Sequence, residues 1–175
     1  MCECIAGKSI YITGNFKSSS VRKQHAGFAA ENVRDYANYL VNLLQDKGYN
    51  VRTCSKEVLL KFELNDIGDG AKKCKLQIVE SEMLNSDQLV VLFTPDITNG
   101  IWEKDHIIYW QIQYALENDM PITIVIIPDL FHDYKLYFDE SGKLKKGLGL
   151  RIIDDILDQS KGQCITWDEL VEHEK

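Results

Sequence analysis

The chain has 175 residues, of which 45% are hydrophobic and 27% charged, the composition of an ordinary globular domain. Its formal net charge of -7 disfavours broad contact with polyanionic nucleic acid or an anionic membrane surface. No apolar run approaches the roughly 18 residues of a membrane span, and the start, MCECIAGKSIYITG, does not resemble a secretory signal. We therefore expect a single domain over residues 1–175 that contacts neither nucleic acid nor membrane.

The cysteines bear on the compartment and on metal binding. There are five of them, an odd number with no paired CxxC spacing: Cys2, Cys4, Cys54, Cys74 and Cys164. This pattern argues against a disulfide framework and against a structural zinc site. The four histidines are scattered at spacings unlike those of metal sites. We predict a reduced, cytoplasmic protein with no metal.

The first predicted elements are a buried strand, a long helix and a second strand. SIYIT, residues 9–13, is a short apolar run that ends at Gly14. Residues 28–47 carry apolar side chains at helical spacing, and Gly48 is a suitable C-terminal stop. YNVRTC, residues 49–54, is the second predicted strand.

The middle of the chain is harder to interpret. Residues 55–75 are dense in turn-forming residues, which favours a loop. We expect three lysines there to lie on a solvated face: Lys72, Lys73 and Lys75. A helix is predicted from about Leu76 to Asn85, and residues 88–94, QLVVLFT, form a nearly continuous apolar strand of the kind covered on both faces.

The remaining pattern is an amphipathic helix, a buried strand and a less regular C-terminal part. The helix begins at His106 and is closed by Pro121, and ITIVIIP, residues 122–128, is the fourth predicted strand. Beyond residue 128 we expect a loop or irregular hairpin, a short helix near residues 151–157, an apolar triplet at 164–166 and a terminal helix from Trp167.

Strands that alternate with helices predict an α/β fold, a three-layer, doubly wound domain with a mainly parallel sheet. Such folds bind ligands at the carboxyl edge of the sheet. Three segments should converge there: TGNFK after the first strand, TPDITNGIW after the third, and the start of the helix that contains Gln111. The chain lacks GxxxxGK[ST], GxGxxG, HExxH and GxSxG motifs, which disfavours ordinary nucleotide triphosphatases, dehydrogenases and serine hydrolases.

Gln111 lies beside the predicted core face of that helix. Ile108, Ile112, Ala115 and Leu116 form this face, and at about 100° per residue Gln111 is about 60° to one side of Ile108. We expect it at the border of the buried stripe, where a polar group can face a cleft. An ordinary boundary glutamine explains the spacing equally well.

Two stretches carry a family resemblance. MLNSDQLVVLFTPDIT, followed by IWEKDHIIYWQIQYALENDMPITIVII, resembles the second half of TIR-like domains, in particular the TIR-like proteins of Thoeris antiphage defence. The positions that match are Ser86, Asp87, Thr98, Trp102 or Trp110, and Gln111 with Ile112. SIYITGNF and the helix to Gly48 also fit, so the resemblance covers a core of about residues 8–128, with residues 129–175 as a C-terminal extension.

The resemblance implies a flavodoxin-like or TIR-like fold and cleavage of the nicotinamide-ribose bond of NAD. The ADP-ribose is then released or re-linked into a signalling nucleotide that acts on a downstream effector protein. NAD is a substrate here, and no cofactor is expected. TIR-like domains often associate to complete a site, which makes a homo-oligomer a further expectation.

The same resemblance assigns the central catalytic position to Gln111, where family members have a glutamate. Departure of nicotinamide leaves an oxocarbenium-like sugar, which a carboxylate stabilises and a neutral amide does not. Turnover should therefore fall, by about 10² to 10³ when a preorganised electrostatic partner is lost. The explanations are an introduced Glu-to-Gln exchange, a naturally silent domain, or a carboxylate from Glu103, Asp105 or Glu117.

We favour the introduced exchange, because glutamine is the isosteric substitute and the surrounding sequence otherwise looks intact. Glu117 is about 240° around the helix from Gln111 and should point away. Glu103 and Asp105 precede the helix, where acidic residues are common because they suit the helix dipole.

The predicted substrate-binding residues come from the converging segments. The Asn15 amide would contact ribose or phosphate and the Phe16 ring would stack on a base, although core packing explains Phe16 equally well. The full predicted set is Gly14, Asn15, Phe16, Thr98, Trp102, Asp105 and Trp110.

Two alternatives stay open. A nucleoside deoxyribosyltransferase-like enzyme shares the α/β layout, the first strand and a glutamate at the ribose site, but its acidic segment is poorly matched by TNGIWEKDHIIYW. A non-catalytic interaction or ligand-sensing module, in which Gln111 is native, is the other alternative.

Overall fold

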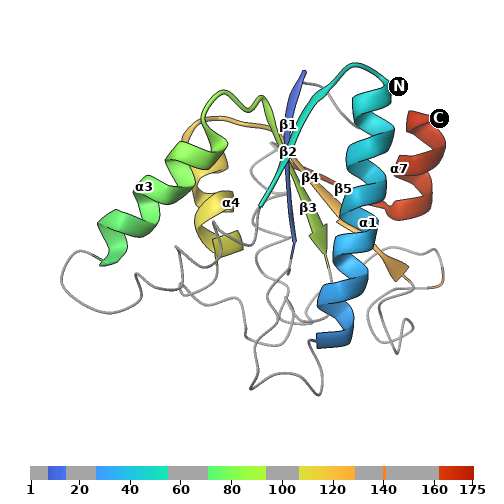
Figure 1. The fold of residues 1–175 in the computed structure, drawn as a ribbon, viewed down its shortest axis with the longest axis horizontal. Helices are drawn as coiled ribbons and strands as arrows, with labels where there is room; N and C mark the ends of the chain where they lie inside the picture. Colours follow the sequence, from blue (N-terminus) through green and yellow to red (C-terminus); the bar gives the residue numbers. More distant parts are fainter. Residues whose placement is uncertain (1–7, 15–26, 55–70, 94–106, 129–139, 141–161) are drawn as a thin grey trace.

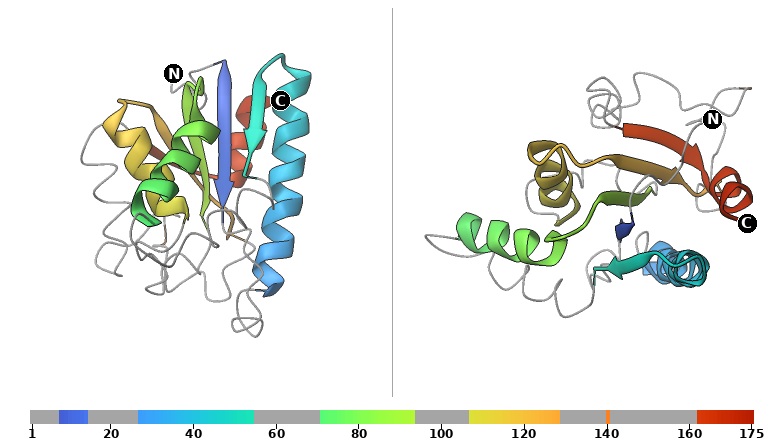
Figure 2. Two further views of the ribbon diagram at one scale, coloured as in Figure 1. Left: turned by 60° about the vertical axis from the view of Figure 1, so that its left-hand side comes forward. Right: turned by 90° about the horizontal axis from the view of Figure 1, so that it is seen from above.

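The computed structural model describes residues 8–14, 27–54, 71–93, 107–128, 140 and 162–175, and Figures 1 and 2 draw the others as a thin grey trace. The predictions for several residues lie outside these ranges: Asn15, Phe16, Thr98, Trp102, Glu103 and Asp105. The short helix predicted near residues 151–157 also lies outside them.

Five parallel strands form one sheet in the order β2-β1-β3-β4-β5 (Figure 1). Their bounds are Ser9–Gly14 for β1, Asn50–Thr53 for β2, Gln88–Phe93 for β3, Ile122–Ile126 for β4 and Gly162–Thr166 for β5. The chain passes from β1 to β2 on one side and then returns to place β3 on the other, which makes the β1/β3 boundary the switch point of a doubly wound sheet. The predicted α/β fold is confirmed.

Helices cover both faces of the sheet (Figures 1 and 2). α1, Gly27–Asp46, and α7, Trp167–Glu174, lie on one face. α3, Ala71–Met83, and α4, Ile107–Glu117, lie on the other and pack against each other. Within the described residues, no helix has the length and apolar character needed to cross a membrane.

Gly14 shows which side of β1 faces which helices. A Cβ atom added to Gly14 would lie 3.0 Å from Cγ1 of Val33 in α1. Side chains alternate along a strand, so Ile10 and Ile12 face α1 and α7. Tyr11 and Thr13 therefore face α3 and α4. The glycine permits close packing of β1 against α1, a structural reason for its presence that needs no ligand.

A polar cluster crosses three strands on the α1 and α7 face. The Thr123 hydroxyl in β4 accepts hydrogen bonds from Nε2 of Gln88 in β3, at 2.5 Å, and from Nε2 of Gln163 in β5, at 3.2 Å. The register places these residues on the side of Ile10, because Ile10 pairs with Gln88. We call Gln88, Thr123 and Gln163 the bonded cluster.

Three sequence predictions differ from the structure. α3 begins at Ala71, about one turn earlier than predicted, so Lys75 is a buried helical residue with 5% exposure rather than part of a solvated face. α4 ends at Glu117, before Pro121, and Asp119 turns the chain with a φ of 54°. The triplet at 164–166 belongs to a fifth strand, β5. All residues of this strand are half-buried, so the sequence carries no continuous apolar run that would have predicted it.

Candidate functional site

Gln111 lies inside the buried face of α4 and has 0% exposure. The expected border position is therefore wrong. The buried surface of α4 is wider than the predicted core face and includes Ile107 and Trp110. This is because α4 packs against α3 as well as against the sheet. Glu117, which was expected to point away from Gln111, is exposed.

Three polar side chains from other elements lie on the same side of the sheet as Gln111. Tyr11 and Thr13 project from β1 toward α3 and α4, and both have 0% exposure. Cys54, which follows β2, donates its backbone N–H to the carbonyl of Ile12 at 3.4 Å, so its side chain lies next to Thr13. The cysteine is 1% exposed. We call Tyr11, Thr13, Cys54 and Gln111 the 111 cluster.

Most polar atoms of the 111 cluster lack a hydrogen bond within the described part of the chain. These atoms are the Tyr11 hydroxyl, Oγ1 of Thr13, and both Oε1 and Nε2 of Gln111. A buried polar group without a partner costs about 1–3 kcal/mol, and such groups are rare in native proteins. Features that lower the stability of the folded state in this way are concentrated at functional sites.

Burial also governs the protonation of the 111 cluster. It raises the pKa of the Cys54 thiol to about 11. The Tyr11 hydroxyl and the Gln111 amide lie close enough to oppose part of this rise, without reaching hydrogen-bond geometry, and Glu82 in α3 adds to it. Burial raises the pKa of Tyr11 as well, assisted by Cys54 and Glu82. Both groups therefore keep their protons at neutral pH and can act as donors.

These protonation states limit the chemistry of the cluster. A protonated thiol is a poor nucleophile and a poor metal ligand. The part of the chain that the structure describes contains no group of three or more His, Cys, Asp or Glu residues that could hold a metal ion. What the 111 cluster offers is a set of neutral hydrogen-bonding groups on one side of the sheet, which are suited to binding and orienting a polar group.

Two members of the predicted substrate site, Gly14 and Trp110, lie within the described residues. Gly14 faces α1, on the opposite side of β1 from Tyr11 and Gln111. Trp110 is 8% exposed, and its ring meets that of Tyr109 edge to face at 5.7 Å. Neither observation tests a role in substrate binding, so those roles stay predictions.

Sequence reasoning missed three members of the 111 cluster. The alternation in SIYIT already places Tyr11 and Thr13 on one face of a strand, and their polar ends were the available signal. No comparable signal marks Cys54, because its position depends on how the end of β2 lies beside β1.

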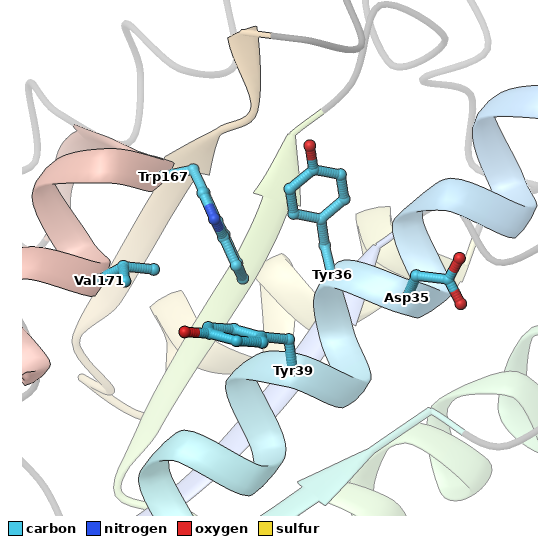
Figure 3. Close-up of a pocket in the computed structure, with 5 residues that line it drawn as sticks. All are labelled: Asp35, Tyr36, Tyr39, Trp167 and Val171. Atoms are coloured by element: carbon cyan, nitrogen blue, oxygen red, sulfur yellow. The ribbon is translucent and has the colours of Figure 1, made fainter.

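A pocket of about 280 Å³ lies on the other face of the sheet, between α1 and α7, and is lined by Asp35, Tyr36, Tyr39, Trp167 and Val171 (Figure 3). The ring of Trp167 meets Tyr36 edge to face at 4.8 Å and Tyr39 at 5.9 Å. In Figure 3 the three rings turn toward one another and the Asp35 carboxylate points away from Trp167. These contacts hold α7 against α1, and the sheet separates them from Gln111.

No protein-family model, curated protein or solved structure matches the chain. The resemblance to TIR-like domains therefore stays a prediction from the sequence. The fold and the geometry of the 111 cluster are the observations available to support a functional proposal.

Proposed function

We propose that the chain is a TIR-like domain whose site is centred on position 111 and acts on NAD. With a carboxylate at that position it would cleave the nicotinamide-ribose bond and make an ADP-ribose-derived signalling nucleotide for an effector in antiphage defence. The observation that supports the proposal is that Gln111 is fully buried with both amide atoms unpartnered, and that the unpartnered, buried hydroxyls of Tyr11 and Thr13 lie on the same side of the sheet. The parallel sheet order is compatible with it.

The charge at position 111 decides the expected activity. Bond cleavage builds positive charge on the ribose, and a carboxylate stabilises that charge, whereas the Gln111 amide supplies only hydrogen bonds. The chain as given should therefore bind NAD and turn it over slowly. NAD is the substrate in this proposal, and no cofactor or metal takes part.

A second candidate is a non-catalytic ligand-sensing or interaction module in which Gln111 is native. The observation that favours it is the 0% exposure of Gln111, because a buried side chain contacts a substrate only after its surroundings open. In this case the chain binds an adenine dinucleotide or an ADP-ribose derivative without releasing nicotinamide.

The experiment that separates these candidates compares the chain with Gln111→Glu and measures nicotinamide release by chromatography. We expect release to rise by about 10² or more, because a full charge is restored opposite the developing cation. Gln113→Glu is the matched control, since Gln113 lies on the same helix, half-buried, and gains the same charge.

Equal nicotinamide release by the chain and by Gln111→Glu would reject the enzymatic proposal. Calorimetry on both proteins completes the comparison. Binding of NAD or ADP-ribose without turnover in either protein would favour the sensing module, and absence of binding would reject both candidates.

A further inference from the structure

The pocket between α1 and α7 lies on the face of the sheet opposite Gln111, and the proposed function does not use it. Its volume of about 280 Å³ is close to the lower end of ligand pockets, roughly 300 Å³, so it suits a small molecule. Tyr39, one of its walls, is 48% exposed and is one of two large hydrophobic side chains that are exposed among the described residues. A ligand in this pocket would cover an aromatic ring that now contacts water.

Three aromatic rings line the pocket and meet at steep angles (Figure 3). The plane of the Trp167 ring is inclined by 86° to that of Tyr36 and by 56° to that of Tyr39. Since neither tyrosine stacks flat on the indole, the rings enclose a corner instead of forming a closed stack. The faces of aromatic rings carry partial negative charge and attract cations.

Both ends of α7 are fixed, which holds the rings in place. At its start, Oγ1 of Thr166 accepts the backbone N–H of Glu169 at 3.3 Å, and Oε2 of Glu169 accepts the backbone N–H of Thr166 at 2.9 Å. At its end, Glu174 forms an ion pair of 3.8 Å with Lys47, the residue that follows α1. Walls that are fixed before binding lose little entropy when a ligand enters.

The charge around the pocket is negative. Asp35 is the only charged residue that lines it within the described part of the chain, and its carboxylate points away from Trp167 in Figure 3. It can therefore attract a cation without occupying the space beside the indole. In α7, the exposed carboxylates of Asp168 and Glu172 directly follow the lining residues Trp167 and Val171. Together with the formal net charge of -7, this arrangement favours a cationic ligand.

We propose that the pocket between α1 and α7 binds a small organic cation that carries a quaternary ammonium group. The methyl groups of such a cation spread its charge over an apolar surface, which suits ring faces better than a compact, strongly hydrated ammonium does. The rings of Tyr39 and Trp167 contact the methyl groups, and Asp35 supplies the opposite charge. Binding requires no residue of the 111 cluster, so this proposal and the proposed function can fail separately.

Choline is the probe, and the matched ligand is its uncharged isostere, in which a tert-butyl group replaces the trimethylammonium group. Proton-nitrogen NMR follows the indole N–H of Trp167 in each titration at constant ionic strength. We expect choline to bind with millimolar affinity and the isostere to bind about fivefold more weakly, because only the charged ligand gains cation–π attraction. Equal affinities would overturn the proposal, and so would a Trp167 signal that does not respond to choline.

The aromatic contribution is tested at Tyr39, whose exposure makes a loss of folding unexpected. Tyr39→Leu keeps apolar contact area but removes the ring, and it should weaken choline binding by about two- to fivefold. Tyr39→Phe keeps the ring and should bind choline as the parent chain does. Tyr114→Leu is the matched control, because it makes the same exchange in α4, on the opposite face of the sheet. Unchanged affinity in Tyr39→Leu would overturn the proposal.

The contribution of charge is tested with Asp35→Asn, which should weaken choline binding by about twofold. Asp46→Asn is the matched control, since this exposed residue ends α1 about 16 Å further along the helix, beyond the screening length of about 8 Å at physiological ionic strength. Equal affinity of the two variants would overturn the role of Asp35. Thermal melting of every variant shows that a loss of binding does not reflect a loss of folding.

Discussion

The buried polar side chains on the two faces of the sheet differ in their hydrogen bonding. On the α1 and α7 face, the bonded cluster joins Gln88 and Gln163 to one threonine hydroxyl across β3, β4 and β5. On the α3 and α4 face, the hydroxyls of Tyr11 and Thr13 and the amide of Gln111 have no partners among the described residues. The same sheet therefore carries one satisfied polar cluster and one unsatisfied one.

This difference separates a structural cluster from a candidate functional one. Side-chain bonds between adjacent strands help to fix their register and satisfy groups that burial would otherwise penalise. An unsatisfied cluster does neither, so stability alone gives no reason to keep it. The contrast suggests where substitutions should weaken the protein and where they should strengthen it.

The largest expected effect is the loss of the bonded cluster. Thr123→Val keeps the side-chain shape but removes the acceptor of two amide groups, one of which, in Gln88, is fully buried. We expect the free energy of unfolding to fall by about 2 kcal/mol, because two side-chain hydrogen bonds, one of them buried, are lost at about 0.5–1.5 kcal/mol each. Urea denaturation measures this change, and an unchanged midpoint would show that the cluster does not stabilise the sheet.

An intermediate effect is expected from Cys54 at alkaline pH. Its folded pKa is about 11, above that of an unfolded thiol, roughly 8.5, so the unfolded chain loses the proton first. The resulting stabilisation is complete below the unfolded pKa and is lost as pH rises toward 11. Between pH 8 and 10 the parent chain should lose about 1–2 kcal/mol more than Cys54→Ala does.

Denaturation of both proteins at several pH values measures that difference. Cys164, whose pKa burial raises to about 12, is present in both and cancels in the comparison. Parallel pH profiles would mean that the Cys54 thiol titrates in the folded protein as it does in the unfolded chain.

The smallest effect should have the opposite sign. Gln111→Met removes an unpartnered amide while keeping an unbranched side chain of similar size, so stability should rise by about 1 kcal/mol. Gln113→Met, at a half-buried position of α4, is the control and should change stability little. A clear loss of stability in Gln111→Met, measured by thermal melting, would contradict the view that this amide is unsatisfied.

The sequence predicted the core of the fold well, because β3 and β4 are continuous apolar runs. α1 ends at Asp46, and Gly48 just beyond it has a φ of 91°, the expected stop conformation. It did not predict β5, since GQCIT is half-buried and has little apolar signal. It drew attention to Gln111 through a resemblance but missed Tyr11, Thr13 and Cys54, whose proximity to Gln111 depends on contacts between distant segments.

The place of β1 inside the sheet has a consequence for how the chain folds during synthesis. β1 is made first, yet it lies between β2 and β3, and the Asp87 carboxylate that accepts the Ser9 N–H is 78 residues further along. At about 5–20 residues per second, a ribosome needs roughly 4–16 s to add those residues. During that interval the apolar strand β1 lacks its neighbour β3, so one edge of it stays open to association with other chains.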